Sequence, residues 1–390
     1  MIAVWCNEGP VYEDKDGNFY GITINDKIIN RYLEYVDKIY MLTRVRKIKK
    51  DEKRYSKISN NEKIEIISIP NCSSIKGILF NTKKAKKIIE QYIEKVDIVF
   101  IGLPSILGNL AVSICNKKNK NYILEVLACP FDSLWNYGNI KGKIMAPIQY
   151  LVTRKKIKDA ANVVYVSNEF LQNRYPNNKN NIGCSDVIID NIDIKNLEKR
   201  IEKINKYDLS YEYNIGLMGS LDLGYKGHDT AIRAVALLKD KYKIKLHFLG
   251  KGNPEKWKKQ IKKYNLEHNV IFDGTLPAGE PVLNWMDEMD IFLIPSLQEG
   301  LPRGLVEAMS RACPAIGVKT GGIPELISKQ YIAEKKDFKK IAKMIEQMIV
   351  KKENMIEQAQ YNFNKSLNYE KEKLYKKRKE FYNNIIIKNN

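Results

Sequence analysis

Residues 297–327 read LQEGLPRGLVEAMSRACPAIGVKTGGIPELI, and this stretch decides the fold because it joins a strand to a helix through a short loop. The apolar run just before it, Ile291–Ile294, predicts a buried strand. A helix should follow with Pro302 as its first residue, because proline fits the first helical position. Two carboxylates bracket the helix start at an E-x7-E spacing, Glu299 in the loop and Glu307 inside the helix.

The expected helix has one apolar face and one charged face. An inward stripe at helical spacing consists of Leu301, Leu305, Ala308, Met309 and Ala312. Arg303 and Glu307 lie together on the opposite side. One interpretation is a solvated surface helix, in which an ion pair between these two residues contributes roughly a few tenths of a kcal/mol.

The other interpretation is a ligand site. A strand-loop-helix junction presents unpaired backbone N–H groups and the positive end of the helix dipole, which suit a phosphate or another anion. Glu299 and Glu307 can accept hydrogen bonds from sugar hydroxyls. Two such acceptors beside one anion site suit a nucleotide sugar, whose diphosphate lies between two rings that carry hydroxyl groups.

This segment resembles the E-x7-E motif of glycosyltransferase family 4. The resemblance implies that Glu299 contacts the hexose of the donor and that Glu307 contacts the ribose of its nucleotide. It places Gly300, Leu301 and Arg303 in the same donor-binding loop. It also implies an α/β fold of the GT-B type, with two Rossmann-like domains facing a central cleft, and a retaining transfer of a hexosyl group.

The length and composition fit a two-domain protein with anionic partners. A chain of 390 residues exceeds what one core usually supports, and its 44% hydrophobic content allows sizeable cores. A formal net charge of +20 favours nucleic acid, acidic lipid surfaces or phosphorylated substrates as partners. No nucleic-acid motif accompanies the charge, so no nucleic-acid partner is expected.

The cysteines and the N-terminal residues indicate a cytoplasmic protein. Six cysteines are scattered without a CxxC pair, which indicates neither a zinc site nor a disulfide framework. The first ten residues, MIAVWCNEGP, lack a basic region and are expected to form a strand and not a signal peptide. The uncharged stretch 98–115 contains Gly102, Pro104 and Gly108, which favours a strand, a loop and a helix over a membrane-spanning helix.

Apolar strands alternate with helical segments, which predicts parallel sheets covered by helices. The first series of expected strands is 2–6, 38–42, 64–69, 96–101, 122–126 and 163–166. The second series of strands is 215–218, 245–249, 270–272, 291–294 and 315–318, with helices at 229–238, 254–264, 280–289, after 302 and near 323. We expect residues 1–200 to form an acceptor domain and residues 201–364 a donor domain. In the fold that the resemblance implies, residues 365–390 return to the first domain.

A loop that could wrap phosphates, GSLDLGYK at 219–226, follows the first strand of the second series. In the family, an Arg directly after the first glycine and a later Lys contact the donor diphosphate. Gly219 and Lys226 match this pattern, but Ser220 replaces the Arg. Loss of a bidentate cation should weaken diphosphate binding, and Arg303 is the candidate substitute. The alternatives are that Lys226 is an ordinary surface lysine and that Arg303 only forms an ion pair or faces solvent.

Two further loops are expected on the donor side. Gly250 and Gly252, in LGKG, permit close backbone approach to a ligand, although a G-x-G is often only a turn. The resemblance implies that the loop after the next strand faces the base, which makes Gly274, Thr275 and Leu276 candidate base contacts. A plain connecting loop is the alternative.

The first domain carries no histidine, whereas many relatives place one in the cleft beside the reacting hydroxyl. All three histidines, His228, His247 and His268, lie in the second half. The candidate for this place is therefore Asp132, within ACPFDSLWNYG. Neighbouring aromatic side chains could stack on a sugar ring, and these are Phe131, Trp135 and Tyr137. The alternative is that Asp132 caps a helix.

Residues 139–176 resemble a stretch of bacterial transferases of capsule and exopolysaccharide assembly. A basic helical part at 154–158 lies beside Ile148, Tyr150 and Leu151. This part could lie on an anionic membrane that carries a lipid-linked acceptor, or it could form a solvated helix. The expected location is cytoplasmic, with peripheral contact at the inner face of the plasma membrane.

Together these features predict a retaining glycosyltransferase of surface polysaccharide biosynthesis. It would move a hexosyl group from a UDP-linked sugar to a glycan or lipid-linked glycan acceptor. Glu299, Lys226 and Asp132 are the predicted catalytic residues, and no cofactor or metal is expected besides the donor. The main alternative is a nucleotide-sugar binding subunit that has lost catalysis, which Ser220 and the missing histidine favour. A phosphorylase is disfavoured because its cofactor lysine motif is absent.

Overall fold

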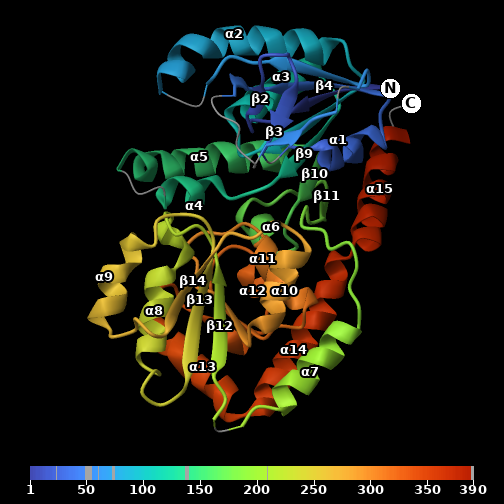
Figure 1. Ribbon diagram of the computed structural model, residues 1–390. Helices are drawn as coiled ribbons and strands as arrows, with labels where there is room; N and C mark the ends of the chain where they lie inside the picture. The colour runs from blue at the N-terminus through green and yellow to red at the C-terminus, as the bar shows by residue number, and fades with distance from the viewer. Residues whose placement is uncertain are drawn as a thin grey trace.

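The computed structural model describes residues 1–387 apart from 23, 49–54, 60, 73–74, 137–139 and 209. The chain forms two α/β bodies, one above the other in Figure 1. We call them the first body, around the sheet of residues 2–183, and the second body, around the sheet of residues 213–333.

The first body contains a seven-stranded parallel sheet. In spatial order its strands are β11 (Asn180–Gly183), β10 (Asn162–Tyr165), β9 (Tyr122–Val126), β8 (Ile98–Leu103), β1 (Ile2–Cys6), β4 (Lys38–Thr43) and β7 (Ile64–Ser68). Its helices are α1 (Asp26–Leu33), α2 (Ile75–Glu94), α3 (Ile106–Lys118), α4 (Pro130–Trp135), α5 (Ile140–Asp159) and α6 (Phe170–Arg174). All residues of β8 and β9 are buried, as expected for central parallel strands whose two faces are covered.

The second body contains a six-stranded parallel sheet. In spatial order its strands are β14 (Val270–Gly274), β13 (Ile244–Leu249), β12 (Tyr213–Met218), β15 (Ile291–Ile294), β16 (Ala315–Val318) and β17 (Ile332–Ala333). Its helices are α8 (His228–Ala236), α9 (Glu255–Lys263), α10 (Glu280–Glu288), α11 (Arg303–Ser310), α12 (Ile323–Leu326) and α13 (Phe338–Val350). The strand order changes direction at β12 and β15, and in open α/β sheets ligands bind at such a switch point beyond the carboxyl ends of the strands.

The predicted strands are all present, and β1, β9, β15 and β16 have the predicted bounds. The others differ from the prediction by one or two residues at an end. The uncharged stretch 98–115 divides into β8 and α3, and the Ser105 hydroxyl caps α3 by accepting from the Gly108 N–H at 2.7 Å. In the part of the chain that the structure describes, no helix is both long and apolar enough to cross a membrane.

A small four-stranded sheet beside the first body was not predicted. Its strands in spatial order are β5 (Val45–Lys47), β2 (Val11–Glu13), β3 (Phe19–Gly21) and β6 (Ser56–Lys57). Each has only two or three residues. Strands of this length contain too few residues to show an alternating apolar pattern, so the sequence gives little sign of them.

The chain passes from the first sheet to the second between residues 183 and 213. This segment contains α7 (Lys195–Asn205), within the charged stretch that we expected to hold the domain boundary. The buried Arg200 guanidinium donates to the backbone carbonyls of Met286 and Met289, so α7 belongs to the packing of the second body. The boundary at residue 200 itself stays a prediction.

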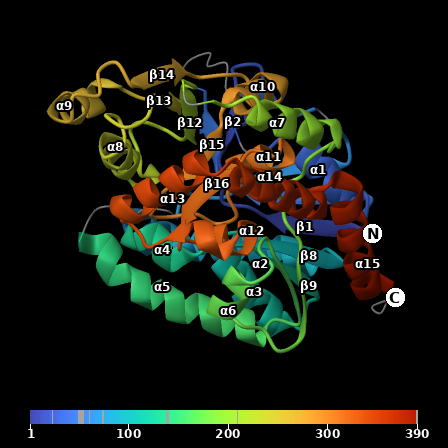
Figure 2. The ribbon, with the colours of Figure 1, turned by 90° about the horizontal axis from the view of Figure 1, so that it is seen from below.

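The last two helices, α14 (Lys352–Ser366) and α15 (Lys371–Ile387), connect the second body with the first (Figures 1 and 2). Helix α14 packs on α11 and α7. Helix α15 reaches the first body, where the buried Tyr382 hydroxyl donates to Glu125 at 2.7 Å and Arg378 donates to the carbonyls of Cys184 and Ser185. The chain therefore crosses between the bodies twice.

Candidate active site

Helix α11 carries the E-x7-E motif, and its inward stripe is buried. Leu305, Ala308, Met309 and Ala312 are fully buried and Leu301 is 9% exposed, as the helical spacing predicted. The helix begins at Arg303, so Pro302 is the cap residue and not the first helical residue that we expected. The reason is its ψ of 112°, which is extended and keeps Pro302 outside the helix.

Lys226 and Glu299 form an ion pair between the two loops of the second body. The Lys226 Nζ lies 2.7 Å from the Glu299 Oε1, and the two side chains are 23% and 11% exposed. The Leu297 N–H donates to the Tyr225 carbonyl at 2.7 Å, which holds the two loops together. The ion pair thus joins the two residues for which the family resemblance implies contacts with the diphosphate (Lys226) and the hexose (Glu299).

Two glycines bring these loops together. Gly227 has a φ of +85°, and a Cβ there would lie 2.3 Å from the carbonyl oxygen of Pro295. At Gly219 a Cβ would lie 2.9 Å from the Cγ of Lys226, because the lysine stem passes over this residue. The Lys226 side chain is therefore packed against the backbone at Gly219, with its ammonium group directed at Glu299, and is not a freely mobile surface lysine.

A small pocket of about 120 Å³ lies between the two bodies at this ion pair. The first body contributes Ala128, Cys129, Asp132 and Ser133, and the second contributes Tyr225, Lys226, Gln298, Glu299 and Gly300. The three predicted catalytic residues, from segments far apart in the sequence, therefore line one pocket. The sequence did not indicate Tyr225, Gln298 or Ser133, although the first two lie directly beside motif residues.

Asp132 is on α4 and is only 7% exposed. Its carboxylate lies 3.3 Å from the Arg174 guanidinium, which the sequence did not indicate because Arg174 is on another helix. The prediction that Asp132 could cap the helix is wrong. The cap is Cys129, whose Sγ accepts from the Asp132 N–H at 3.4 Å, so the Asp132 side chain remains available to Arg174 and the pocket.

Helix α4 also touches the loop that carries Glu299. The Asn136 side-chain amide donates to the Leu297 carbonyl at 3.4 Å, and the Gln298 amide donates to the Ser133 hydroxyl at 3.3 Å. These long polar contacts span the cleft between the bodies. They place Asp132 opposite Glu299 without a direct bond between the two carboxylates.

The aromatic residues near Asp132 differ in what they contact. The Phe131 ring stacks on Trp135 with centroids 5.3 Å apart, and the Arg174 guanidinium lies 5.0 Å from the Phe131 centroid. Phe131 is therefore engaged by protein side chains, whereas Trp135 is 46% exposed. Tyr137 lies outside the described residues.

The glycine-containing loops of the second body lie at the same end of the sheet as Lys226. The structure shows that Gly250 allows close approach of the protein backbone, because a Cβ there would lie 2.1 Å from the Gly219 carbonyl oxygen. Gly252 lies against Asp222 in the same way. The three candidate base contacts lie at and just after the end of β14 and are exposed; they are Gly274, Thr275 and Leu276.

Ser220, Arg303 and Glu307 do not line the small pocket. Arg303 is exposed at the start of α11, and Glu307 is partly buried one turn further on. Burial raises the pKa of Glu307, and the nearby Arg303 charge opposes this rise. Among the described residues no ion pair within 4 Å joins Arg303 to an acidic residue, so the alternative of an ion pair with Glu307 is not realised, and Arg303 is exposed to solvent.

None of the three histidines lies in the pocket. His228 is fully buried against Trp257, and burial lowers its pKa to about 4. His247 lies 3.2 Å from the Asp273 carboxylate, and His268 lines a different cavity. The described residues contain no group of three or more His, Cys, Asp or Glu side chains placed to hold a metal ion.

Sequence analysis did not predict a contact between the bodies that is made by Glu325, a residue of the stretch 297–327. The Glu325 carboxylate, on α12, accepts from the backbone N–H groups of Asn168, Glu169 and Phe170 at 3.0, 2.7 and 3.2 Å. It neutralises the N-terminal end of α6 across the cleft. The acceptor was visible in the sequence, but its partners could not be identified without the fold.

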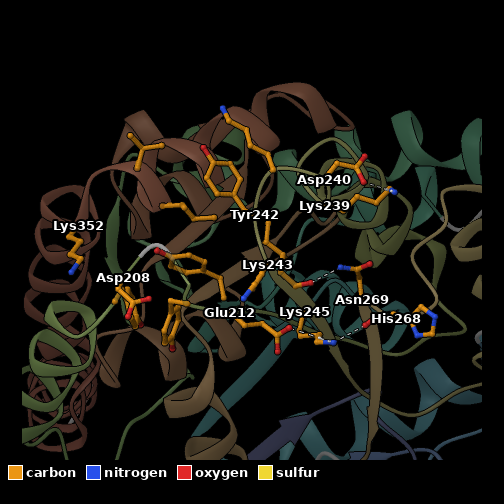
Figure 3. A pocket seen from close by; sticks show the side chains of 17 residues that line it. Asp208, Glu212, Lys239, Asp240, Tyr242, Lys243, Lys245, His268, Asn269 and Lys352 are labelled. Carbon is orange, nitrogen blue, oxygen red and sulfur yellow. Dashed lines mark hydrogen bonds and ion pairs between the residues drawn. The ribbon is translucent and has the colours of Figure 1, made fainter.

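A larger cavity of about 840 Å³ lies elsewhere on the second body (Figure 3). It is lined by the starts of β12 and β13, including Tyr213 and Ile244, and by lysines and acidic residues from neighbouring loops. Lys226 follows the other end of β12. Since ligands of such sheets bind beyond the carboxyl ends of the strands, the small pocket between the bodies is the better candidate.

Two α/β bodies, each built on a parallel sheet, face each other across a pocket that contains Lys226 and Glu299. This is the arrangement of a glycosyltransferase of the GT-B class. The same fold occurs in the crystal structure of Anabaena HepE in complex with UDP, which matches with a TM-score of 0.68. The identity is 14%, and the match covers 97% of this chain and 98% of HepE.

The sequence comparisons give the family. The family described as "Glycosyl transferases group 1" matches residues 212–351. The chain is 35% identical to Protein CapJ of Staphylococcus aureus over 99% of its own length and 98% of CapJ. It is 36% identical to the putative colanic acid biosynthesis glycosyltransferase WcaL of Escherichia coli strain K12, over 26% of this chain and 27% of WcaL. The chain belongs to the group 1 glycosyltransferases and is therefore an enzyme of glycosyl transfer.

Proposed function

We propose that this enzyme transfers a hexosyl group from a UDP-linked sugar to a glycan or lipid-linked glycan during surface polysaccharide biosynthesis, with retention of the anomeric configuration. The observation that carries the proposal is the shared pocket of Glu299, Lys226 and Asp132 between the two bodies. In this pocket Glu299 could bind the hexose, Lys226 the diphosphate and Asp132 the acceptor hydroxyl.

The donor would replace the Lys226–Glu299 ion pair with two new interactions. Lys226 would turn to the diphosphate, and Glu299 would accept hydrogen bonds from the hexose hydroxyls. Glu307 would accept from the ribose, and the exposed loop with Gly274, Thr275 and Leu276 would face the base. Arg303 is the proposed second cation for the diphosphate, in place of the arginine that Ser220 replaces.

The chemical step would be a front-face displacement. The bond between the anomeric carbon and the phosphate oxygen breaks, and a bond from the acceptor oxygen forms on the same face. The acceptor proton passes to the departing phosphate oxygen, while Lys226 and the N-terminal end of α11 stabilise the charge of the UDP. Asp132 would orient the acceptor hydroxyl, because the first body has no histidine for this place.

The relatives support the pathway and the nucleotide. WcaL is named for colanic acid biosynthesis, and HepE has been crystallised with UDP and with UDP-glucose. Transfer of these properties to this chain is part of the proposal. The proposed location is the cytoplasm, peripheral at the inner face of the plasma membrane.

A second candidate is a nucleotide-sugar binding subunit without catalysis. Two observations favour it: Ser220 in place of the arginine, and the lack of a first-body histidine. The two candidates differ in one measurable property, which is the release of UDP from a donor.

The test is to screen UDP-sugars for protection of the purified chain against thermal unfolding, and then to measure UDP release from the protective sugar. We expect one or a few sugars to stabilise the protein and to be turned over, also in the presence of EDTA. Protection without any UDP release, with and without acceptor glycans, would favour the binding subunit. Complete loss of turnover in EDTA that magnesium or manganese restores would refute the metal-independent mechanism.

A further inference from the structure

The outward face of α5 is apolar. Six large hydrophobic residues on this helix are exposed, namely Ile140 (77%), Ile144 (61%), Met145 (39%), Ile148 (48%), Leu151 (65%) and Val152 (39%). At 100° per residue they fall within less than half of the helix circumference. We call these six residues the α5 stripe.

The opposite side of α5 holds the helix on the protein. Its buried residues are Gly142, Ala146, Thr153 and Ile157, of which three are small. A surface helix of a globular protein normally has its large apolar residues inward and its polar residues outward. In α5 the larger apolar side chains face outward, and a contiguous exposed patch of this kind marks an interaction surface.

The residues around the α5 stripe are basic. Those that are exposed on the same helix are Lys141, Lys143, Arg154, Lys155 and Lys158. Asp159, the last residue, is its single acidic residue. Lys141, Lys155 and Lys158 lie on the same side of the helix as the stripe, at its two ends, so α5 presents apolar and cationic side chains together, a combination suited to the interface of an anionic bilayer. A second copy of this chain is a poor partner for the patch, because the net charge is +20 and two copies repel each other.

The stripe is close to the pocket between the bodies. Helix α4 packs against α5 and lines the pocket with Asp132 and Ser133. On the same short helix, Trp135 is 46% exposed, and tryptophan is favoured at the level of lipid headgroups. A substrate anchored in a membrane beside α5 would therefore be close to the side of the pocket that α4 lines.

A second basic element lies at the same edge of the molecule. Helix α9 carries five exposed lysines, namely Lys256, Lys258, Lys259, Lys262 and Lys263. In Figures 1 and 2, α9 and the start of α5 both lie at the left-hand edge, α9 on the second body and α5 on the first. Only the start of α5 shares this edge with α9, because α5 runs from there across the molecule in both views.

We propose that the α5 stripe inserts into the headgroup region of an anionic phospholipid bilayer and thereby places the pocket beside membrane-anchored acceptors. Trp135 and the lysines of α5 contact the headgroups. This inference deepens the proposed function, on which the peripheral membrane location and the lipid-linked nature of the acceptor rest, but vesicle binding can be measured separately from transferase activity.

The test is co-sedimentation of the full chain with vesicles of phosphatidylglycerol and phosphatidylcholine, and with vesicles of phosphatidylcholine alone. We expect binding to the anionic vesicles and at least about tenfold weaker binding to the neutral ones, because basic residues near the surface contribute to the attraction. The double variant Ile144→Gln/Leu151→Gln should bind anionic vesicles at least about tenfold more weakly, since two apolar side chains no longer enter the interface.

Two exposed apolar residues of the second body provide the matched control, Leu237 at 56% and Val350 at 63%. The variant Leu237→Gln/Val350→Gln should bind vesicles like the wild type. Equal vesicle binding by the α5 variant and the wild type, or no binding by the wild type, would overturn the proposal. A wild-type dimer in light scattering that the α5 variant loses, without vesicle binding, would assign the stripe to self-association and also overturn it.

The same variants separate this inference from the proposed function. The α5 variant should retain UDP-sugar binding and UDP release with a soluble acceptor, which also shows that it is folded. Vesicle binding without any transferase activity would leave the docking surface standing and would remove the proposed function. Loss of vesicle binding with unchanged use of lipid-linked acceptor would sink the role of the α5 stripe in acceptor access.

Discussion

The two sides of the cleft are built in different ways. On the second body, Lys226 and Glu299 come from loops that are joined by a backbone hydrogen bond and form an ion pair at 2.7 Å. On the first body, Asp132 is on the short helix α4 and is paired at 3.3 Å with Arg174 from another helix. The donor side is thus held by local backbone packing, and the acceptor side by contacts between separate helices.

The two sides of the pocket can be assigned to two requirements of glycosyl transfer, which are binding of the donor and binding of the acceptor. A donor sugar and its diphosphate are chemically similar throughout a family, so the same loop geometry can serve many enzymes. Acceptors differ in shape, and the side of the pocket proposed to meet them is lined by α4 and the residues just before it. Changes on the donor side should therefore affect every reaction of the donor, and changes on the acceptor side only transfer to the acceptor.

The largest effect is expected from Glu299→Ala. Removal of the carboxylate leaves the hexose hydroxyls without the hydrogen-bond acceptor that we propose, and it leaves Lys226 without its partner. Both UDP release and glycosyl transfer should therefore fall about 10³-fold. Steady-state assays with and without acceptor measure this. Glu267→Ala, an exposed glutamate of the same body, is the control and should keep wild-type rates. Retention of more than about a tenth of the activity in Glu299→Ala would contradict the assignment.

Lys226→Ala should follow with a loss of about 10²-fold in kcat for both reactions, because the leaving diphosphate loses its cation. UDP affinity should fall as well, and a thermal shift titration measures it. Lys226→Arg should restore part of the UDP affinity, since the charge is kept. The exposed Lys343 supplies the control, Lys343→Ala, which should change neither quantity. Unchanged UDP affinity in Lys226→Ala would mean that the lysine does not reach the diphosphate.

The proximity of Lys226 and Glu299 could be predicted although they are 73 residues apart, because each lies in a loop that directly follows a strand of the same parallel sheet. Glu299 and Glu307 are in one strand-loop-helix segment, and Lys226 follows a strand that pairs with the strand before Glu299. The place of Lys226 and Glu299 at the carboxyl end of the sheet then follows from parallel topology. Strands such as β8, β9, β15 and β16 could be predicted because each is a short apolar run that is buried throughout.

The acceptor side could be predicted only in part. Asp132 was a candidate, but its partner Arg174 is on another helix, and Gln298, which lines the same pocket, is on the other body. The packing of separate segments brings these residues together, and no short motif signals it. The contact of Glu325 with the start of α6 was missed for the same reason. Sequence analysis predicted a basic helical part beside Ile148 and Leu151 that could lie on a membrane, but not the length of the α5 stripe, because exposure of Ile144 is a property of the packed protein.

Asp132→Asn tests whether the acceptor side acts separately from the donor side. We expect transfer to the acceptor to fall about tenfold, because the amide orients a hydroxyl less well than a carboxylate, while UDP release without acceptor stays at the wild-type rate. Assays of both reactions on the same preparation measure the split. Asp186→Asn, an exposed aspartate of the first body, should leave both rates unchanged. Equal losses in both reactions would show that Asp132 acts on the donor.

Arg303→Ala should have a smaller effect, a roughly threefold weaker UDP affinity, because an exposed cation contributes little. The result decides whether Arg303 stands in for the arginine that Ser220 replaces. Arg311 supplies the comparison, since its guanidinium is already paired with Asp287 in the same body. Donor affinity and turnover equal to the wild type in Arg303→Ala would remove Arg303 from the site.

The smallest effect is expected in the pH dependence of UDP binding through Glu307. Burial raises the pKa of Glu307 above that of an unfolded chain, so the carboxyl becomes neutral at a higher pH in the folded protein. A neutral carboxyl accepts hydrogen bonds from the ribose less well, and UDP affinity should fall about two- to threefold as the pH decreases through this pKa. Glu307→Gln should lower the affinity at neutral pH by the same factor and remove the pH dependence.

Protonation of Glu307 changes the stability of the folded protein in the opposite direction to acid unfolding, which distinguishes weaker UDP binding at low pH from loss of the fold. Because the folded pKa of Glu307 is raised, protonation favours the folded state: its contribution to stability is present below the unfolded pKa and is lost as the pH rises through the folded pKa. Weaker UDP binding at lower pH would therefore coincide with a stabilising contribution from Glu307 and not with local unfolding. Arg303→Ala should shift the midpoint of this pH dependence upward, since the arginine charge opposes the rise in the Glu307 pKa. An identical pH dependence in wild type and Glu307→Gln would show that another group controls UDP binding.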